Sequence, residues 1–256
     1  MRTASGVHVT VWGNGEPAVL VHGSFGWGEE TWREQRPLAD DYRLMLLDRR
    51  GFGASAANGR VDFDRDAEDV AELLGEGAHL VGHSYGGVVS LLAAGRRPDV
   101  VRSLVLIEPP AFGLARGDEA VETLIANVNA AAKATQDPSE YRAAFLRGFG
   151  FPAQPTPLHD ESLAAARASM TERPPWEANI PLDELERAGL RVLLVQGDWC
   201  PAPDSARALA GKAFRAVCDV LHTRLHAQRA LFPAAHNPQK LGALFNDRVR
   251  SFWEAP

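Results

Sequence analysis

Cysteine is scarce in this chain of 256 residues. Only Cys200 and Cys218 occur, and neither lies in the Cys-x-x-Cys or Cys/His spacing that is typical of a zinc site. We therefore predict no bound metal. The low cysteine content also favours a reducing, cytoplasmic compartment.

Long hydrophobic runs and an excess of positive charge are missing as well. No segment reaches the roughly 18 consecutive apolar residues that a membrane-spanning helix needs, and residues 1–10 contain no apolar core of a secretory signal. The formal net charge of −6 provides no basic surface for nucleic acid or anionic lipid. We expect neither kind of partner, and the sequence indicates no oligomeric state.

Short apolar segments separated by helical patterns predict a layered α/β fold with a mostly parallel central sheet and helices on both faces. After the first, these segments are continuously apolar, as strands are when both faces of a parallel sheet are covered. The seven predicted strands are Val7–Trp12, Ala18–Val21, Tyr42–Leu47, Ala78–Val81, Val101–Ile107, Val192–Val195 and Ala227–Leu231.

The alternation of strands and helices stops between Ala111 and Leu190. This segment is rich in alanine, is interrupted by FPAQPTP and RPPW, and contains no convincing strand. We predict a core formed by residues 1–110 and 191–256, with residues 111–190 inserted as a helical cap.

The segment VGHSYGG at Val81–Gly87 fits the pattern G-x-S-x-G, with an apolar strand before it and a helical pattern after it. A serine on a sharp strand-to-helix turn needs small neighbours two residues away on either side, and such a turn exposes its hydroxyl. We predict that Ser84 is a nucleophile. The other interpretation is a glycine-rich turn in which the serine caps a helix.

Acyl transfer also requires hydrogen-bond donors where the carbonyl oxygen becomes negative. We assign one donor to the backbone N–H of Tyr85, directly after the serine. The second is expected from the loop after the strand at residues 18–21, as the N–H of Ser24 or, as the alternative, of Phe25. His22 and His83 flank glycines, and we expect them to hydrogen-bond the backbone.

The segments HGSFGW (22–27), DRRGFGAS (48–55) and GHSYGG (82–87), followed by a late histidine, resemble the α/β-hydrolase family over residues 7–108 and 191–253. The resemblance implies a sheet of eight strands, one more than the seven found. It also implies that the loop at residues 48–55 is structural, and we expect Arg49 or Arg50 to anchor this loop by salt bridges.

A serine hydroxyl needs an imidazole to remove its proton. His236 lies in FPAAHNP, between the last predicted strand and the last helix, where the family carries its catalytic histidine. His222 and His226 are alternatives, but they lie in a helical segment and at the start of a strand.

The family pattern breaks at the acid. The usual position, three residues after Gly197, holds Cys200, and a neutral thiol cannot balance an imidazolium. Three carboxylates remain, Glu108, Asp198 and Asp204, of which Asp204 is expected instead to cap the helix that begins around Ser205. Glu108 is favoured because it ends the strand that follows the nucleophile's helix, an arrangement that some α/β hydrolases resemble.

These residues predict a serine hydrolase, of the carboxylic ester hydrolase type, that needs no cofactor. Its expected substrate is a small, fairly apolar carboxylic ester or lactone, cleaved through an acyl-enzyme. The same residues also serve cofactor-free perhydrolases, haloperoxidases and C–C hydrolases, and the cysteine at position 200 leaves a non-catalytic ligand-binding protein as a further alternative. Phe25, Trp27 and Trp176 are expected to line the substrate pocket.

Overall fold

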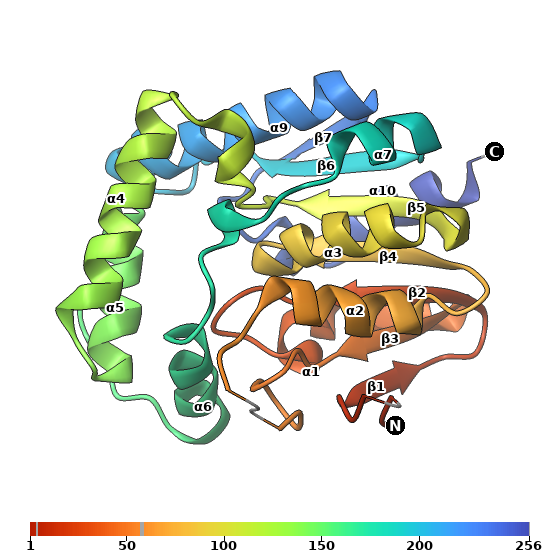
Figure 1. Cartoon of the computed structure of the whole chain (residues 1–256), viewed down its shortest axis with the longest axis horizontal. Coiled ribbons are helices and arrows are strands. Elements are labelled where there is room, and N and C mark those ends of the chain that lie inside the picture. Colours follow the sequence, from red (N-terminus) through yellow and green to blue (C-terminus); the bar gives the residue numbers. More distant parts are fainter. Residues whose placement is uncertain (4, 57–58, 256) are drawn as a thin grey trace.

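The computed structural model describes residues 1–3, 5–56 and 59–255. Seven strands form one sheet in the order β1-β3-β2-β4-β5-β6-β7 (Figure 1). Strand β1 runs antiparallel to β3, and all other neighbouring strands are parallel. The strands are β1 (Val9–Trp12), β2 (Glu16–Val21), β3 (Tyr42–Leu47), β4 (Ala78–His83), β5 (Val101–Ile107), β6 (Val192–Gly197) and β7 (Gln228–Phe232).

The predicted α/β fold is confirmed, and each predicted strand overlaps one of the seven observed. The described residues show no eighth strand. Every residue of the central strands β4 and β6 is buried, which explains why these segments are continuously apolar rather than alternating. The edge strand β7 is mostly exposed, and this accounts for its weaker apolar pattern.

Helices cover both faces of the sheet, and each face has its own hydrophobic cluster. Helices α2, α3, α7 and α9 pack over one face, while α1 and α10 pack over the other (Figure 1). Their bounds are α1 (Gly28–Trp32), α2 (Phe63–Leu73), α3 (Tyr85–Arg96), α7 (Leu182–Ala188), α9 (Lys212–Leu225) and α10 (Ala243–Glu254). A short α8 (Asp204–Ala206) and the π-helical turn Arg207–Gly211 lead into α9.

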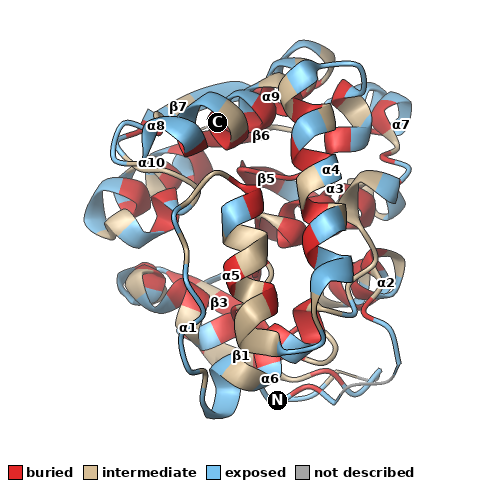
Figure 2. Ribbon diagram, turned by 90° about the vertical axis from the view of Figure 1, so that its left-hand side faces the viewer, coloured by how far each residue is buried: buried red, intermediate tan, exposed pale blue. Residues whose placement is uncertain are grey.

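Three helices stand beside the carboxyl ends of the parallel strands. These are α4 (Glu119–Ala134), α5 (Pro138–Gly148) and α6 (Asp160–Ser169), and Figure 2 looks onto them from outside. Between residues 111 and 190 the described chain forms helices and no strand. Helix α7, at the end of this segment, packs against α3 and α9 on the sheet face. None of the helices in the described ranges is long and apolar enough to cross a membrane.

Aspartates begin the two longest helices of this layer, because a side-chain oxygen at this position satisfies N–H groups that lack a partner in the first turn. Asp118 accepts hydrogen bonds from the backbone N–H groups of Ala120 and Val121 at the start of α4. Asp137 accepts one from Glu140 at the start of α5, where Pro138 occupies the first helical position.

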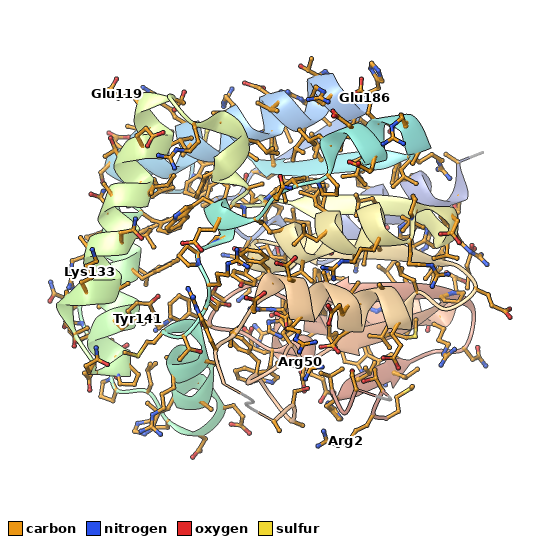
Figure 3. All side chains as sticks on the ribbon, in the orientation of Figure 1. Arg2, Arg50, Glu119, Lys133, Tyr141 and Glu186 are labelled. Carbon is orange, nitrogen blue, oxygen red and sulfur yellow. The ribbon has the colours of Figure 1, made fainter. Side chains whose placement is uncertain are left out.

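The loop after β3 is anchored by a fully buried guanidinium. Arg49 forms ion pairs with Asp66 of α2 at 3.1 Å and with Glu172, which follows α6, at 2.6 Å. It also donates hydrogen bonds to the carbonyl oxygens of His22 and Gly23. The neighbouring Arg50, labelled in Figure 3, pairs with Asp69 of α2. Arg49 thus ties the β2 loop, helix α2 and the segment after α6 to one point.

We expect Arg49→Met to lower the free energy of unfolding by about 3–5 kcal/mol, because it leaves two buried carboxylates without their partner. Arg65→Met is the matched control, since Arg65 and Glu68 form an exposed pair on α2, and its effect is expected below ~1 kcal/mol. Urea unfolding followed by circular dichroism measures both. Equal midpoints for the two variants would contradict a stabilising role of the Arg49 cluster.

Candidate active site

Ser84 lies on a strained turn between β4 and α3. Its backbone has φ 52° and ψ −126°, a conformation that is costly for any residue with a side chain. The N–H of Ser84 donates to the carbonyl oxygen of Ile107 on β5, and its own carbonyl accepts from Gly87. Hydrogen bonds on both sides therefore hold the residue at the carboxyl edge of the sheet.

Two glycines make this turn possible by letting other backbone segments approach it. A methyl group on Gly86 would lie 2.2 Å from the carbonyl oxygen of Val21 on β2, and one on Gly23 would lie 2.7 Å from the Cβ of Ser84. Both distances are too short for real contacts. The loop after β2 therefore runs directly beside the serine.

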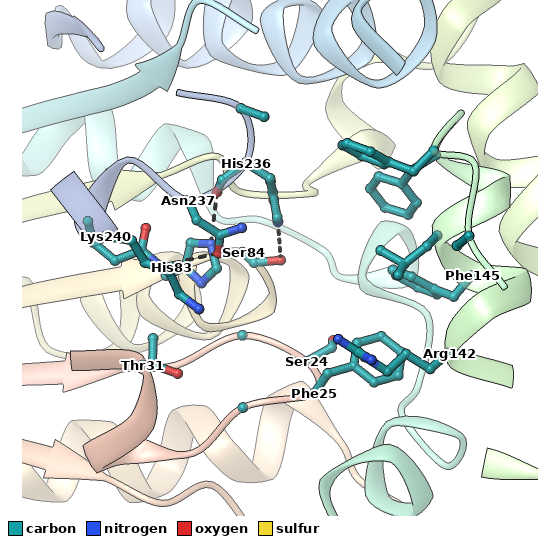
Figure 4. A pocket seen from close by; sticks show the side chains of 18 of the residues that line it. Ser24, Phe25, Thr31, His83, Ser84, Arg142, Phe145, His236, Asn237 and Lys240 are labelled. Atoms are coloured by element: carbon teal, nitrogen blue, oxygen red, sulfur yellow. Dashed lines mark hydrogen bonds between the residues drawn. The ribbon is translucent and has the colours of Figure 1, made fainter. Parts of the chain in front are cut away.

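The structure brings His236 to Ser84 from 152 residues away. Its Nε2 lies 2.9 Å from the serine Oγ, within hydrogen-bond distance (Figure 4). The ring packs against Phe214, with centroids 4.6 Å apart, and lies near Phe149 and Trp199. Burial beside these rings lowers the pKa of His236 to about 4. The imidazole is therefore neutral near pH 7, the state that a base requires.

Glu108 faces the other ring nitrogen from the end of β5. Its Oε2 lies 3.8 Å from Nδ1 of His236, beyond hydrogen-bond distance, and neither atom has a partner among the described residues. Its Oε1 accepts the N–H of Gly197 at 2.8 Å and the indole N–H of Trp199 at 3.4 Å. Closing the remaining gap by roughly 1 Å would form the bond that orients the imidazole.

Burial raises the pKa of the Glu108 carboxyl to about 8, although the hydrogen bond from Gly197 opposes this shift. Below that pH the carboxyl is protonated. Oε1 already accepts two N–H groups, so Oε2 is the oxygen available to His236. Once the carboxyl has lost its proton, a carboxylate at Oε2 favours the tautomer with the ring proton on Nδ1, which leaves Nε2 free to accept a proton from Ser84.

Asp198, the alternative acid, points elsewhere. Its Oδ1 accepts the backbone N–H of Cys200 at 2.9 Å, which closes a local turn, and the described residues show no contact between Asp198 and His236. Cys200 is exposed. Of the carboxylates considered from the sequence, Glu108 is the one that lies beside the imidazole.

The loop after β2 lies where the second oxyanion donor is predicted. The hydroxyl of Ser24 donates to Oε2 of Glu172 at 2.5 Å. The N–H of Phe25, the alternative donor, donates to the hydroxyl of Ser169 at 2.9 Å and is therefore already used. Tyr85 is the first residue of α3, so its N–H has no partner within the helix. The N–H groups of Ser24 and Tyr85 remain the predicted pair.

His22 and His83 both contact the backbone. Nδ1 of His22 lies 2.7 Å from the carbonyl oxygen of Gly23, and its Nε2 accepts the N–H of Arg49. Nε2 of His83 lies 3.0 Å from the carbonyl oxygen of His236. Since a carbonyl only accepts, His83 donates this bond and helps to position the chain at His236.

Ser84 borders two cavities. The outer cavity has a volume of about 720 Å³ and is bordered by Arg142, His236 and Lys240, among others (Figure 4). The inner cavity has a volume of about 80 Å³, and its lining includes Phe112, Val128, Met170 and Trp176. Four residues border both cavities, namely Ser24, Ser84, Phe145 and Phe149.

The three aromatic side chains that are predicted to line the substrate pocket lie in different places. Phe25 borders the outer cavity and Trp176 the inner one. Trp27 does not belong to the described lining of either cavity, because it packs with a separate cluster that contains Phe52 and Val61. The loop itself stays at the site, since Gly26 before Trp27 and Glu30 and Thr31 after it border the outer cavity, and only the side chain of Trp27 packs away from it.

Two site residues could not be expected from the sequence. Arg142 of α5 borders the outer cavity, and Glu172 reaches the loop after β2. No motif marks them, because the helical segment between β5 and β6 contains only amphipathic patterns. Within the described ranges, no cluster of three or more His, Cys, Asp or Glu side chains is arranged to hold a metal ion.

Comparison with known proteins gives consistent matches. The sequence matches the model of the alpha/beta hydrolase family over residues 18–243. A pimeloyl-[acyl-carrier protein] methyl ester esterase from Methylococcus capsulatus is 31% identical over 219 residues, covering 83% of this chain and 82% of that protein.

Two further matches differ in how much they cover. The dihydrolipoyllysine-residue acetyltransferase component of an acetoin cleaving system from Pseudomonas putida is 42% identical over 121 residues, 45% of this chain; the match spans only 32% of that protein. An alpha/beta hydrolase structure from Sphaerobacter thermophilus superimposes with a TM-score of 0.65 at 20% identity, covering 99% of both chains.

The raised pKa of Glu108 predicts that the reactivity of Ser84 depends on pH. We expect the rate at which a fluorophosphonate labels Ser84 to rise between pH 7 and 9 with a midpoint near 8, because loss of the Glu108 proton sets the reactive tautomer of His236. In Glu108→Gln this rise should be absent, and the rate at pH 9 should be lower by roughly 10²-fold or more.

Asp198→Asn is the matched control, and its labelling should rise with pH as in the wild type. If the labelling rate still rises with pH in Glu108→Gln but no longer does so in Asp198→Asn, then Asp198 is the acid and Glu108 is not.

Proposed function

Since this chain belongs to the alpha/beta hydrolase family, we propose that it is a serine hydrolase that cleaves small, fairly apolar carboxylic esters through an acyl-enzyme. The observation that carries this proposal is the 2.9 Å contact between the Oγ of Ser84 and the Nε2 of His236. The esterase of Methylococcus capsulatus, which matches most of this chain, supports the same reaction class.

In the proposed acylation step, Nε2 of His236 takes the proton of Ser84 as Oγ attacks the ester carbonyl. The carbonyl oxygen becomes negative and accepts hydrogen bonds from the backbone N–H groups of Ser24 and Tyr85. Glu108, as a carboxylate, balances the charge of the imidazolium. His236 then donates its proton to the leaving alcohol, the C–O bond breaks, and the acyl group remains on Ser84.

In the proposed deacylation step, His236 removes a proton from water, and the resulting attack on the acyl-enzyme forms a second tetrahedral intermediate with the same oxyanion donors. The proton returns from His236 to Oγ of Ser84 as the carboxylic acid leaves. One water is consumed, and one acid and one alcohol are released.

We expect Ser84→Ala to abolish hydrolysis of p-nitrophenyl butanoate and labelling by a fluorophosphonate, because both require the serine oxygen. Ser251→Ala, which changes an exposed serine on α10, is the matched control and should retain both. Release of p-nitrophenol and intact-protein mass spectrometry measure the two effects. Unchanged turnover by Ser84→Ala would overturn the proposal, and a folded wild-type protein that resists labelling would favour a binding protein.

We assign the acyl chain to the inner cavity, because His236, which must reach the leaving alcohol, borders only the outer one among the described linings. The small size of the inner cavity then predicts a preference for short acyl chains. At about 80 Å³ it is far smaller than cavities that hold drug-sized ligands. We expect kcat/KM for p-nitrophenyl butanoate to exceed that for the octanoate by about tenfold or more.

Met170→Ala widens the inner cavity and should reduce this preference. Leu146→Ala, which changes the outer cavity alone, should leave the preference intact. A wild-type enzyme that turns over octanoate faster than butanoate would show that the acyl chain does not occupy the inner cavity.

A further inference from the structure

The position of His236 decides which part of an ester enters which cavity. His236 borders the outer cavity and does not belong to the described lining of the inner one. In ester cleavage the imidazole must give its proton to the leaving oxygen, so the leaving alcohol lies on the side of the imidazole. The alcohol part therefore occupies the outer cavity, and the acyl group bound to Ser84 occupies the inner one.

The outer cavity contains a cation that has no partner. Arg142 extends from α5 into this cavity beside Phe25 (Figure 4). Its side chain is half-buried, and across the described residues it forms no ion pair and no hydrogen bond. By contrast, Arg147, one turn further along α5, pairs with Glu140 and donates to the carbonyl of Ala153.

The other charges that border the outer cavity cancel. Lys240 pairs with Glu30 at 3.2 Å, and no other Lys, Arg, Asp or Glu of the described chain belongs to the lining. In the inner cavity, Glu172 is held by Arg49 at 2.6 Å. The lining thus leaves one positive charge uncompensated, and that charge lies in the cavity for the alcohol.

We propose that Arg142 binds a carboxylate on the alcohol part of the substrate, so that the preferred substrate is a short-chain acyl ester of an alcohol that bears one negative charge. This inference rests on the proposed hydrolase function. A guanidinium presents a planar fork of N–H donors that matches a carboxylate. A single free cation matches a monoanion, whereas a phosphate dianion would leave a charge without a partner.

Two esters that differ only in this charge test the proposal. They are 4-(acetoxymethyl)benzoate and its neutral carboxamide, 4-(acetoxymethyl)benzamide; both release acetate, and their charged or neutral group lies far from the reacting carbonyl. We expect the wild-type kcat/KM to be about tenfold higher for the benzoate, the size of one charge-assisted contact in a partly open site. Liquid chromatography of the released alcohols measures both rates.

Variants of two arginines on α5 distinguish a specific contact of Arg142 with the substrate from a general effect of positive charge. Arg142→Gln should lose the preference for the benzoate, because its kcat/KM should fall by about tenfold more for the benzoate than for the benzamide. Arg142→Lys should retain part of the preference, because it keeps the charge but loses the fork. Arg147→Gln is the matched control and should behave as the wild type.

Three results would overturn this inference: equal turnover of the two esters by the wild type, a preference that survives in Arg142→Gln, or an equal fall for both esters in that variant. The last would indicate that Arg142 stabilises the oxyanion instead. If the benzamide is hydrolysed, the hydrolase proposal stands whatever the outcome for Arg142. If neither ester is hydrolysed and Ser84 resists a fluorophosphonate, the hydrolase proposal fails as well.

Discussion

The strained backbone at the carboxyl edge of the sheet is the constraint on which the site depends. Ser84 follows β4 with φ 52°, and Glu108 follows β5 with φ 46°. Phe25 and Trp199, after β2 and β6, also have positive φ. Such conformations persist only where the surroundings enforce them. Here adjacent parallel strands end together, and each sharp turn aims a side chain or an N–H group at one small volume.

Much of this arrangement follows from the sequence, because it depends on local signals. The continuous apolar runs mark buried strands, and the glycines around Ser84 mark a turn that another residue type could not occupy. The sequence could also predict that His236 and Glu108 lie near Ser84, since the carboxyl ends of parallel strands meet at one edge of the sheet. The choice between Glu108 and Asp198 needed the structure, because a shift of a few residues in a turn reverses where a side chain points.

The other features of the site could not be predicted, because they depend on contacts between distant segments that carry no sequence motif. Ser24 meets Glu172 across 148 residues, and α5 contributes Arg142 and Phe145 to the cavities. The sequence of the helical segment reports only which faces are apolar. How α4, α5 and α6 lie across the strand ends depends on tertiary packing. Trp27 shows that a residue next to a motif in the sequence need not direct its side chain into the pocket.

The two hydrogen bonds that join the loop after β2 to residues 169 and 172 limit how this architecture can diversify. The hydroxyl of Ser24 and the N–H of Phe25 both depend on that short segment. Sequence changes there therefore disturb the surroundings of Ser84 directly. Tyr141 and Phe145 of α5 pack against Phe25 of the same loop, so substitutions at these two positions of the helix also reach the surroundings of Ser84.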